Sequence, residues 1–201
     1  MRNNILALLA SFFLISYPLS VQAVENKEYL ISFSAGELTS PKLLEDADMS
    51  ISDKYVCKTE LTKENAEKGK KLLKVTLTKG KGKFGVTNPE KEDWSKWDSL
   101  KFKVFNPQDF TIRMNFVARE KDRGYGPAGS GPDNDWASRS DSSVMIKSGW
   151  NDLTLDLTTF ATNGAKENFN MKRILEWSFC GGSDEAPAIF LFFSDLEFSN
   201  E

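Results

Sequence analysis

The chain has 201 residues, with 26 Lys and Arg, 29 Asp and Glu and no His, so its formal net charge is −3. A mildly acidic chain without a concentrated basic cluster is a poor reader of nucleic-acid backbones, because phosphate binding depends on clustered Lys and Arg. The lack of His excludes an imidazole base, a Ser-His-Asp relay and imidazole metal ligands.

The first 23 residues have the features of a signal peptide. A short start that carries Arg2 precedes an apolar stretch over residues 5–17, and small residues up to Ala23 suit cleavage. The apolar stretch is short for a membrane span, although a retained anchor is the alternative interpretation. We expect a signal peptide at 1–23, a secreted or periplasmic product, and no membrane contact after cleavage.

The remaining residues, 24–201, are expected to form one β-sandwich domain. Removal of the signal peptide leaves 201 − 23 = 178 residues, which is a usual size for a domain with a single core. The sequence contains no visible internal repeat and no low-complexity linker that would divide it.

Apolar and polar residues alternate along most of this domain, as they do in strands with one buried face. At 100–105, Leu100, Phe102 and Val104 alternate with other residues, and a proline turn leads to a second such strand at 110–117. Further strands are predicted at 29–33, 50–59, 72–77, 83–87, 143–147, 151–157, 173–179 and 188–198. Helical candidates are limited to 41–48 and a turn near 157–162. The pattern predicts an all-β fold, a two-sheet antiparallel β-sandwich.

The last predicted strand contains a carboxylate, Asp195, directly after a run of apolar residues. Burial of an unpaired charge is costly. We therefore expect Asp195 to lie at the rim of the sheet, to accept backbone hydrogen bonds or to contact a cation.

The two cysteines, Cys57 and Cys180, would meet an oxidising compartment after export. A disulfide between them would close a loop of more than a hundred residues and stabilise the fold by about 4 to 5 kcal/mol in the chain-entropy model. Two separate buried thiols are the alternative, because the sequence does not show whether their Cβ atoms approach each other. A metal site built on these two residues alone is not expected.

The longest irregular segment, 120–136, is rich in Gly, Pro and Asp and also contains Tyr125 and Trp136. Loops of this length in a compact domain often carry function. Its aromatic residues could stack on a flat ligand face while Asp122 accepts hydrogen bonds. The alternative is a disordered insertion in which Trp136 packs against the edge of the sandwich.

Several segments together resemble a known family. They include DWSKWDSLKFKVFN at 93–106, KSGWNDLTLD at 147–156 and LFFSDLEF at 191–198, in order with 30–37, 69–77 and 171–174. In this order they resemble the galactose-binding-like jelly rolls that serve as carbohydrate-binding modules. The resemblance covers essentially the whole domain and implies a jelly-roll fold, whereas the ligand is not specified because this architecture supports many binding roles.

The resemblance also implies roles for individual residues. Trp94 would pack at the core edge, and Trp150 would be structural rather than ligand-facing. Such modules often hold a structural calcium ion between an Asp of the terminal strand, here Asp195, and an acidic residue of the first strand. The expected acidic position is occupied by Ser34, so Glu37, three residues later, would replace it. A fold without metal is the alternative, because most calcium ligands are oxygens that a sequence does not reveal.

The ligand surface of the family is either the concave sheet or the loops at one edge. Arg113 and Asn115 alternate with the apolar residues of their strand, so they should project from the opposite sheet face. If 120–136 is an insertion, Asp122, Trp136 and Arg139 match the family pattern of an acidic, an aromatic and an arginine residue. A guanidinium can donate several hydrogen bonds to sugar hydroxyls, and an aromatic ring can cover the C–H face of a pyranose.

Arg139 has a second interpretation. It could form an ion pair with Asp141 or Asp135, which would contribute little if it were exposed.

These observations predict an exported, noncatalytic carbohydrate-binding module that recognises a polysaccharide or glycan. Catalysis is not expected, because the chain has no imidazole. Acidic residues that are neighbours in the sequence, such as Glu45 with Asp46 and Asp184 with Glu185, lie in polar turns where they are usually solvated. A structural or adhesive β-sandwich that binds a separate protein partner through a strand edge is the alternative.

Overall fold

The computed structural model describes residues 28–33, 57–77, 80–120, 138–163, 169–183 and 188–200. Regular structure in these ranges consists of β-strands and the short 3-10 helix η1 (Leu157–Thr159), which lies at the turn predicted near 157–162. The all-β prediction is confirmed. The predicted signal peptide at 1–23 and helix at 41–48 lie outside the described residues. None of the described helical structure is long and apolar enough to cross a membrane.

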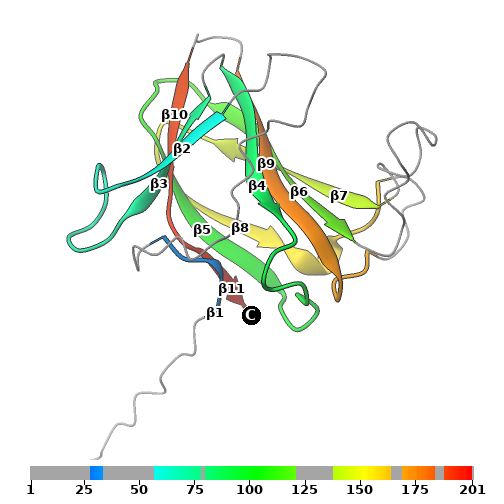
Figure 1. Cartoon of the computed structure of the whole chain (residues 1–201). Coiled ribbons are helices and arrows are strands. Elements are labelled where there is room, and N and C mark those ends of the chain that lie inside the picture. The colour runs from blue at the N-terminus through cyan, green and yellow to red at the C-terminus, as the bar shows by residue number, and fades with distance from the viewer. Residues whose placement is uncertain are drawn as a thin grey trace, which may run out of the picture.

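Seven strands of the described chain form the larger, antiparallel sheet. These strands are β1 (Glu28–Ile31), β2 (Cys57–Thr62), β3 (Leu72–Leu77), β5 (Ser99–Asn106), β8 (Gly149–Asp156), β10 (Ile189–Phe193) and β11 (Leu196–Ser199). Their order is β1-β11-β5-β10-β3-β2, and β8 pairs along the other edge of β5. The first and last described strands therefore lie side by side (Figure 1).

Four described strands form the smaller sheet, which faces the larger one (Figure 1). They are β4 (Lys81–Thr87), β6 (Ile112–Glu120), β7 (Arg139–Ile146) and β9 (Ile174–Gly182), in the order β4-β9-β6-β7. Strands β4 and β9 approach closely at Gly85, where a Cβ atom would lie 2.1 Å from the Trp177 carbonyl oxygen. Only glycine fits at this position.

Aromatic rings from both sheets fill the space between them. Phe179 of β9 lies at the centre, with ring centroids 5.3 Å from Phe84 and 5.0 Å from Phe116 in its own sheet. From the opposite sheet, Phe102 and Phe193 lie 5.2 Å from the same ring. The alternation predicted for 100–105 and 110–117 thus directs its apolar residues into one shared core, as a β-sandwich requires.

Trp94 lies at the edge of this core, as predicted. Its side chain is fully buried, and its ring contacts Phe116 and Phe198 at centroid distances of 6.3 and 5.7 Å. The indole nitrogen donates a hydrogen bond of 2.8 Å to the carbonyl oxygen of Lys91, which satisfies its polar atom.

Some strand boundaries differ from the prediction. The strand expected at 143–147 begins at Arg139, and the one expected to end at 117 continues to Glu120. The extensions contain Arg, Ser, Asp and Glu, so these segments lack the apolar alternation that identifies a strand. Pairing between Val117 and Asp141 and between Arg119 and Arg139 nevertheless continues the ladder.

The strand expected at 188–198 is interrupted, and the interruption involves Asp195. Strands β10 and β11 pair with β5 one after the other. Between them, Lys103 donates its backbone N–H to Ser194 Oγ at 2.8 Å, and Ser194 donates its own to the Lys103 carbonyl at 2.9 Å. The Asp195 carboxylate accepts the backbone N–H of Phe33 at 2.5 Å. The prediction that Asp195 accepts a backbone hydrogen bond is confirmed.

The predicted disulfide is absent, since no bridge joins Cys57 and Cys180 in the structure. Cys57 lies on β2 of the larger sheet, and its side chain belongs to the core. Cys180 follows the core residue Phe179 on β9, so its side chain points to the outward face of the smaller sheet. A sheet separates the two sulfur atoms, and the alternative of two separate thiols describes this structure.

Candidate functional site

The outward face of the smaller sheet is polar and charged. Successive residues of a strand point to opposite faces, so every second residue of β4, β6, β7 and β9 lies here. We call this surface the polar face, and it contains Lys83, Arg113, Asn115, Arg119, Arg139, Asp141, Ser143, Glu176 and Ser178. The register places Asn115 between Cys180 and Ser143, and Arg119 between Glu176 and Arg139.

Three of the predicted ligand-binding residues, Arg113, Asn115 and Arg139, lie on the polar face. Two of them are connected by hydrogen bonds across β6 and β7. Arg113 donates to Ser143 Oγ at 3.1 Å, and Ser143 Oγ donates to Asn115 Oδ1 at 2.8 Å. The sheet therefore holds these polar side chains in a defined orientation before any ligand arrives.

Arg139 forms an ion pair of 3.0 Å with Asp141, which lies two residues along the same strand. The interpretation of Arg139 as an ion-pairing residue is therefore confirmed for Asp141, whereas Asp135 lies outside the described residues. This ion pair is compatible with ligand binding, because a guanidinium carries five N–H donors and the pair orients the group.

Glu176 is the most deeply buried charged group described on the polar face, with 5% of its side chain exposed. Lys83 Nζ lies 2.9 Å and Arg119 Nη1 3.5 Å from its carboxylate oxygens. A buried carboxylate requires such compensation. Glu176 is not among the residues predicted from the sequence, although Glu176 and Ser178 alternate with Trp177 and Phe179 in the expected period of two.

The other predicted ligand-binding residues, Asp122, Tyr125 and Trp136, lie outside the described residues. Their segment, 121–137, joins β6 to β7. Its two ends meet next to Arg119 and Arg139, where Glu120 donates its backbone N–H to the carbonyl oxygen of Ser138 at 2.9 Å. The loop therefore begins and ends at one end of the polar face.

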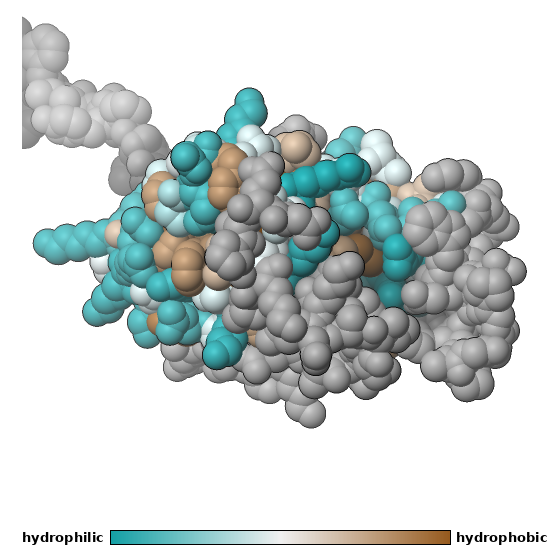
Figure 2. Space-filling view, turned by 90° about the horizontal axis from the view of Figure 1, so that it is seen from above, coloured by the Kyte–Doolittle hydropathy of each residue, from teal (hydrophilic) through white to brown (hydrophobic). Residues whose placement is uncertain are grey.

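One view of the surface also bears on the kind of partner. From above, hydrophilic side chains predominate among the described residues, and hydrophobic ones form small separate spots (Figure 2). The described residues visible in Figure 2 form no broad apolar patch of the kind that marks large hydrophobic interfaces.

Of the two predicted calcium ligands, Glu37 lies outside the described residues. Asp195 is described, and one of its oxygens accepts the Phe33 N–H. The described ranges contain no group of three or more His, Cys, Asp or Glu side chains that could hold a metal ion. Of the two predicted ligands, the described residues therefore include Asp195 alone.

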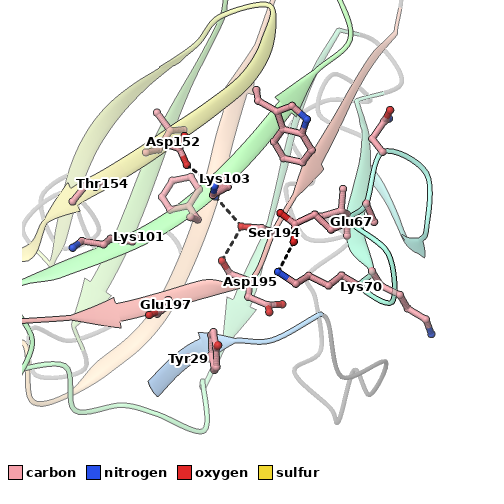
Figure 3. Close-up of a pocket in the computed structure, with 17 residues that line it drawn as sticks. Tyr29, Glu67, Lys70, Lys101, Lys103, Asp152, Thr154, Ser194, Asp195 and Glu197 are labelled. Carbon is pink, nitrogen blue, oxygen red and sulfur yellow. Dashed lines mark hydrogen bonds and ion pairs between the residues drawn. The ribbon is translucent and has the colours of Figure 1, made fainter. Parts of the chain in front are cut away.

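The outward face of the larger sheet contains a pocket of about 720 Å³. Figure 3 shows lysine and acidic side chains around it, contributed by β5, β8, β11 and the β2–β3 hairpin. Asp195 lines this pocket at the interruption between β10 and β11, and Tyr29 contributes from β1. No sequence pattern predicts this pocket, because its walls come from segments far apart in the chain.

Trp150, for which the resemblance implies a structural role, also lines the pocket. One side of the ring packs on Phe105 at a centroid distance of 5.3 Å, but 49% of the residue is exposed. The turn before it requires a positive φ of +84° at Gly149, and the Asn151 side chain donates to the carbonyl oxygens of Lys147 and Gly149 at 2.8 and 3.0 Å. Trp150 is thus firmly positioned and accessible to a ligand.

Comparisons with known proteins extend the description of the fold. Neither a family model nor a curated protein matches the sequence. Among solved structures, the chain is similar to the family 11 carbohydrate-binding module from Clostridium thermocellum in complex with a β-1,3-1,4-mixed-linked tetrasaccharide. The identity is 14% over 78% of this chain and 93% of the other, with a TM-score of 0.52.

Two further solved structures are similar. For the family 11 module of the cellulosomal cellulase Lic26A-Cel5E of Clostridium thermocellum, the identity is 15% over 81% of this chain and 95% of the other, with a TM-score of 0.52. An exo-β-agarase matches at 12% identity and a TM-score of 0.55, over 86% of this chain and 25% of its own length. At these identities the likeness confirms the predicted jelly-roll β-sandwich of carbohydrate-binding modules.

Proposed function

We propose that this protein is a noncatalytic carbohydrate-binding module that recognises a polysaccharide or glycan at its polar face and the adjoining 121–137 loop. The observation that carries this proposal is the position of Arg113, Asn115 and Arg139 on one outward sheet face of a jelly roll. Arg and Asn side chains donate hydrogen bonds to sugar hydroxyls, and the loop would add Asp122, Tyr125 and Trp136 as acceptor and stacking groups.

Binding without catalysis is consistent with the groups on the polar face. Its acidic residues, Asp141 and Glu176, each form ion pairs with arginine or lysine. A glycosidase instead needs two carboxyl groups that flank the bond to be broken. We therefore expect the protein to release no reducing sugar from a polysaccharide that it binds.

The proposal is tested by affinity electrophoresis and isothermal titration with mixed-linked β-1,3-1,4-glucan and agarose, chosen from the ligand of one similar module and the enzyme class of another neighbour. We expect retention on at least one of them. Arg113→Ala, Arg139→Ala and Trp136→Ala should each weaken binding about tenfold, because each removes charge-assisted hydrogen bonds or a stacking surface. The matched control is Lys58→Ala, which removes an exposed cation from the outward face of the larger sheet.

Two results would overturn the proposal. Loss of binding in the Lys58→Ala control to the same extent would point to nonspecific charge effects. Failure of the native protein to bind any glycan on a broader array would favour the alternative, a β-sandwich that binds a separate protein partner.

We also propose a structural calcium ion, with Asp195 and Glu37 among its ligands. The resemblance supports it, and the remaining ligands would have to come from backbone carbonyls and the region of Glu37. If calcium binds, the unfolding temperature should be higher in calcium than in EDTA, because a ligand that binds only the native state stabilises it. Equal unfolding temperatures would rule the ion out.

Export completes the proposal, and the composition of the first 23 residues supports it. Intact mass of the protein recovered outside the cytoplasm should match a chain that starts at Val24. A full-length mass in the cytoplasmic fraction would contradict export.

A further inference from the structure

The pocket on the larger sheet lies where the sheet divides. Strand β1 pairs with β11, and β3 pairs with β10, so the two partner strands separate at Ser194 and Asp195. The β2–β3 hairpin projects from β3 beside this division and forms one wall. Strands β5 and β8 form the floor, as Figure 3 shows for Lys101, Lys103, Asp152 and Thr154. At about 720 Å³, the pocket is in the size range of small-molecule sites.

Charges of opposite sign alternate around the pocket. Lys103 and Asp152 form an ion pair of 3.1 Å across β5 and β8, and Lys101 lies opposite Glu197 in the register of β5 and β11. The formal charges of the lining residues sum to zero. Four are lysines and four are carboxylates: Lys70, Lys71, Lys101, Lys103, Glu67, Asp152, Asp195 and Glu197. A lining without net charge gives little advantage to a strongly anionic or cationic ligand.

The hairpin wall contributes one of these charge pairs. Lys70 and Glu67 form an ion pair of 2.7 Å, and the Lys70 backbone N–H donates to the Glu67 carbonyl at 2.9 Å. Glu67 raises the pKa of Lys70 above its usual range, with smaller contributions from Asp195 and Tyr29. Lys70 in turn lowers the pKa of Glu67, with a smaller contribution from Lys103. The charges of the hairpin thus interact with Lys103 on the floor and with Asp195 at the division.

Paired charges suit a neutral ligand that carries many hydroxyl groups. Each hydroxyl can donate to a carboxylate and accept from a lysine ammonium, so it can interact with both members of a pair. Thr154 and the Ser194 hydroxyl add weaker polar groups to the same lining.

The pocket also contains an accessible aromatic surface. Trp150 is half exposed and backed by Phe105, and Tyr29 lines the pocket from β1. An exposed indole that is fixed in place can cover the apolar C–H face of a pyranose ring. This combination of an aromatic surface and paired charges is the chemistry that recognises a saccharide.

We propose that this pocket is a second saccharide site, which takes a short neutral oligosaccharide and is independent of the polar face. It shares a ligand class with the proposed function, on which the choice of probes rests, but shares no residue with the polar face. Either site can therefore be disproved by experiment without affecting the other. A protein with sites on both outward faces could connect two glycan chains.

The test is titration of the ¹⁵N-labelled protein with neutral tetrasaccharides, followed by NMR. The probes are the mixed-linked β-1,3-1,4-tetrasaccharide and neoagarotetraose at up to about 10 mM, with tetragalacturonate as a charged comparison. We expect at least one neutral probe to shift the Trp150 indole N–H and the backbone amides of 65–71 and 150–154. Trp150→Phe identifies the indole signal among the five tryptophans.

Variants assign the binding to the pocket. Trp150→Ala should weaken binding there about tenfold, through loss of the stacking surface, and Trp150→Phe should retain part of it. The matched control is Phe190→Ala, because Phe190 is 40% exposed on the same sheet face but does not line the pocket. Arg139→Ala should leave the chemical-shift changes at the pocket unchanged, because Arg139 and Trp150 lie on different sheets.

The outcomes separate the two proposals. Shifts confined to β6 and β7 would overturn the second site and leave the proposed function standing. Shifts confined to the pocket would support this site and contradict the polar face. Stronger binding of tetragalacturonate than of either neutral probe, or no pocket shift with any probe, would overturn the second site.

Discussion

At the scale of single residues, one step along a strand decides the chemistry of a side chain. Phe179 points into the core, and Cys180, its neighbour, points to the polar face. Burial raises the pKa of the Cys180 thiol above its ordinary value, and the Asp141 carboxylate adds to this rise. The thiolate is the reactive form of cysteine, so Cys180 should be a poor nucleophile in the folded protein.

We expect Cys180 to react with iodoacetamide more slowly in the native protein than in urea, and we expect both cysteines to be alkylated in urea without a reductant. Peptide mass spectrometry separates the two positions. A mass lower by two hydrogens and no alkylation before reduction would instead show the disulfide that the sequence suggested.

The direction of this pKa shift also gives a dependence of stability on pH. Because the native state keeps the Cys180 proton to higher pH than the unfolded chain does, unfolding releases a proton once the pH exceeds the ordinary value for cysteine, about 8.5. Its contribution to stability is therefore present below that pH and decreases as the pH rises above it.

At the scale of elements, the informative feature is the interruption between β10 and β11. The apolar run of the last segment predicted a continuous strand at 188–198, and two separate parts of it pair with β5, at Phe192 and Phe193 and again at Glu197 and Phe198. The sequence also predicted that Asp195 would lie at the rim of the sheet, accept backbone hydrogen bonds or contact a cation, and it accepts the backbone N–H of Phe33. The sequence does not show where the sheet divides. The division arises because β10 pairs with β3 and β11 pairs with β1 at the edges that face away from β5.

Asp195→Asn should reduce the free energy of unfolding by about 1 to 3 kcal/mol, the usual contribution of a part-buried hydrogen bond to a charged group. Urea denaturation followed by tryptophan fluorescence measures the change. The control is Asp152→Asn, which removes a carboxylate that is 80% exposed from an ion pair with Lys103. That change should have little effect, because exposed ion pairs contribute little. Equal effects of both substitutions would contradict a structural role for Asp195.

The candidate site shows the same division between what a sequence predicts and what it does not. Alternation along 110–117 was enough to direct Arg113 and Asn115 away from the core. It did not reveal Glu176, because a carboxylate between Leu175 and Trp177 becomes meaningful only when Lys83 and Arg119 of neighbouring strands are placed beside it. Likewise, the resemblance implied a structural role for Trp150, which packs on Phe105, but the sequence does not show that the same ring is half exposed in a pocket.

At the scale of the whole molecule, the two outward faces differ in chemistry while one core supports both. The polar face is built from every second residue of the smaller sheet, and the pocket is built on the larger sheet. The inward residues of both sheets meet in the aromatic cluster around Phe179. The geometry of either face therefore depends on the packing of rings between the sheets.

Phe179→Ala should lower the free energy of unfolding by about 3 to 5 kcal/mol, because it removes a ring that contacts aromatic residues of both sheets and leaves a cavity. That is a large share of the total stability of a domain, about 5 to 15 kcal/mol, so Phe179→Leu serves as a milder variant and should cost less than half as much. Phe190→Ala is the control, with an expected change of about 1 kcal/mol or less at an exposed position.

Chemical denaturation gives these free energies, and saccharide titration of the folded variants shows whether the outward faces keep their geometry. A Phe179→Ala protein as stable as the Phe190→Ala control would contradict a shared core. If instead Phe179→Leu folds but binds more weakly at both faces, the common core is what holds the two surfaces in shape.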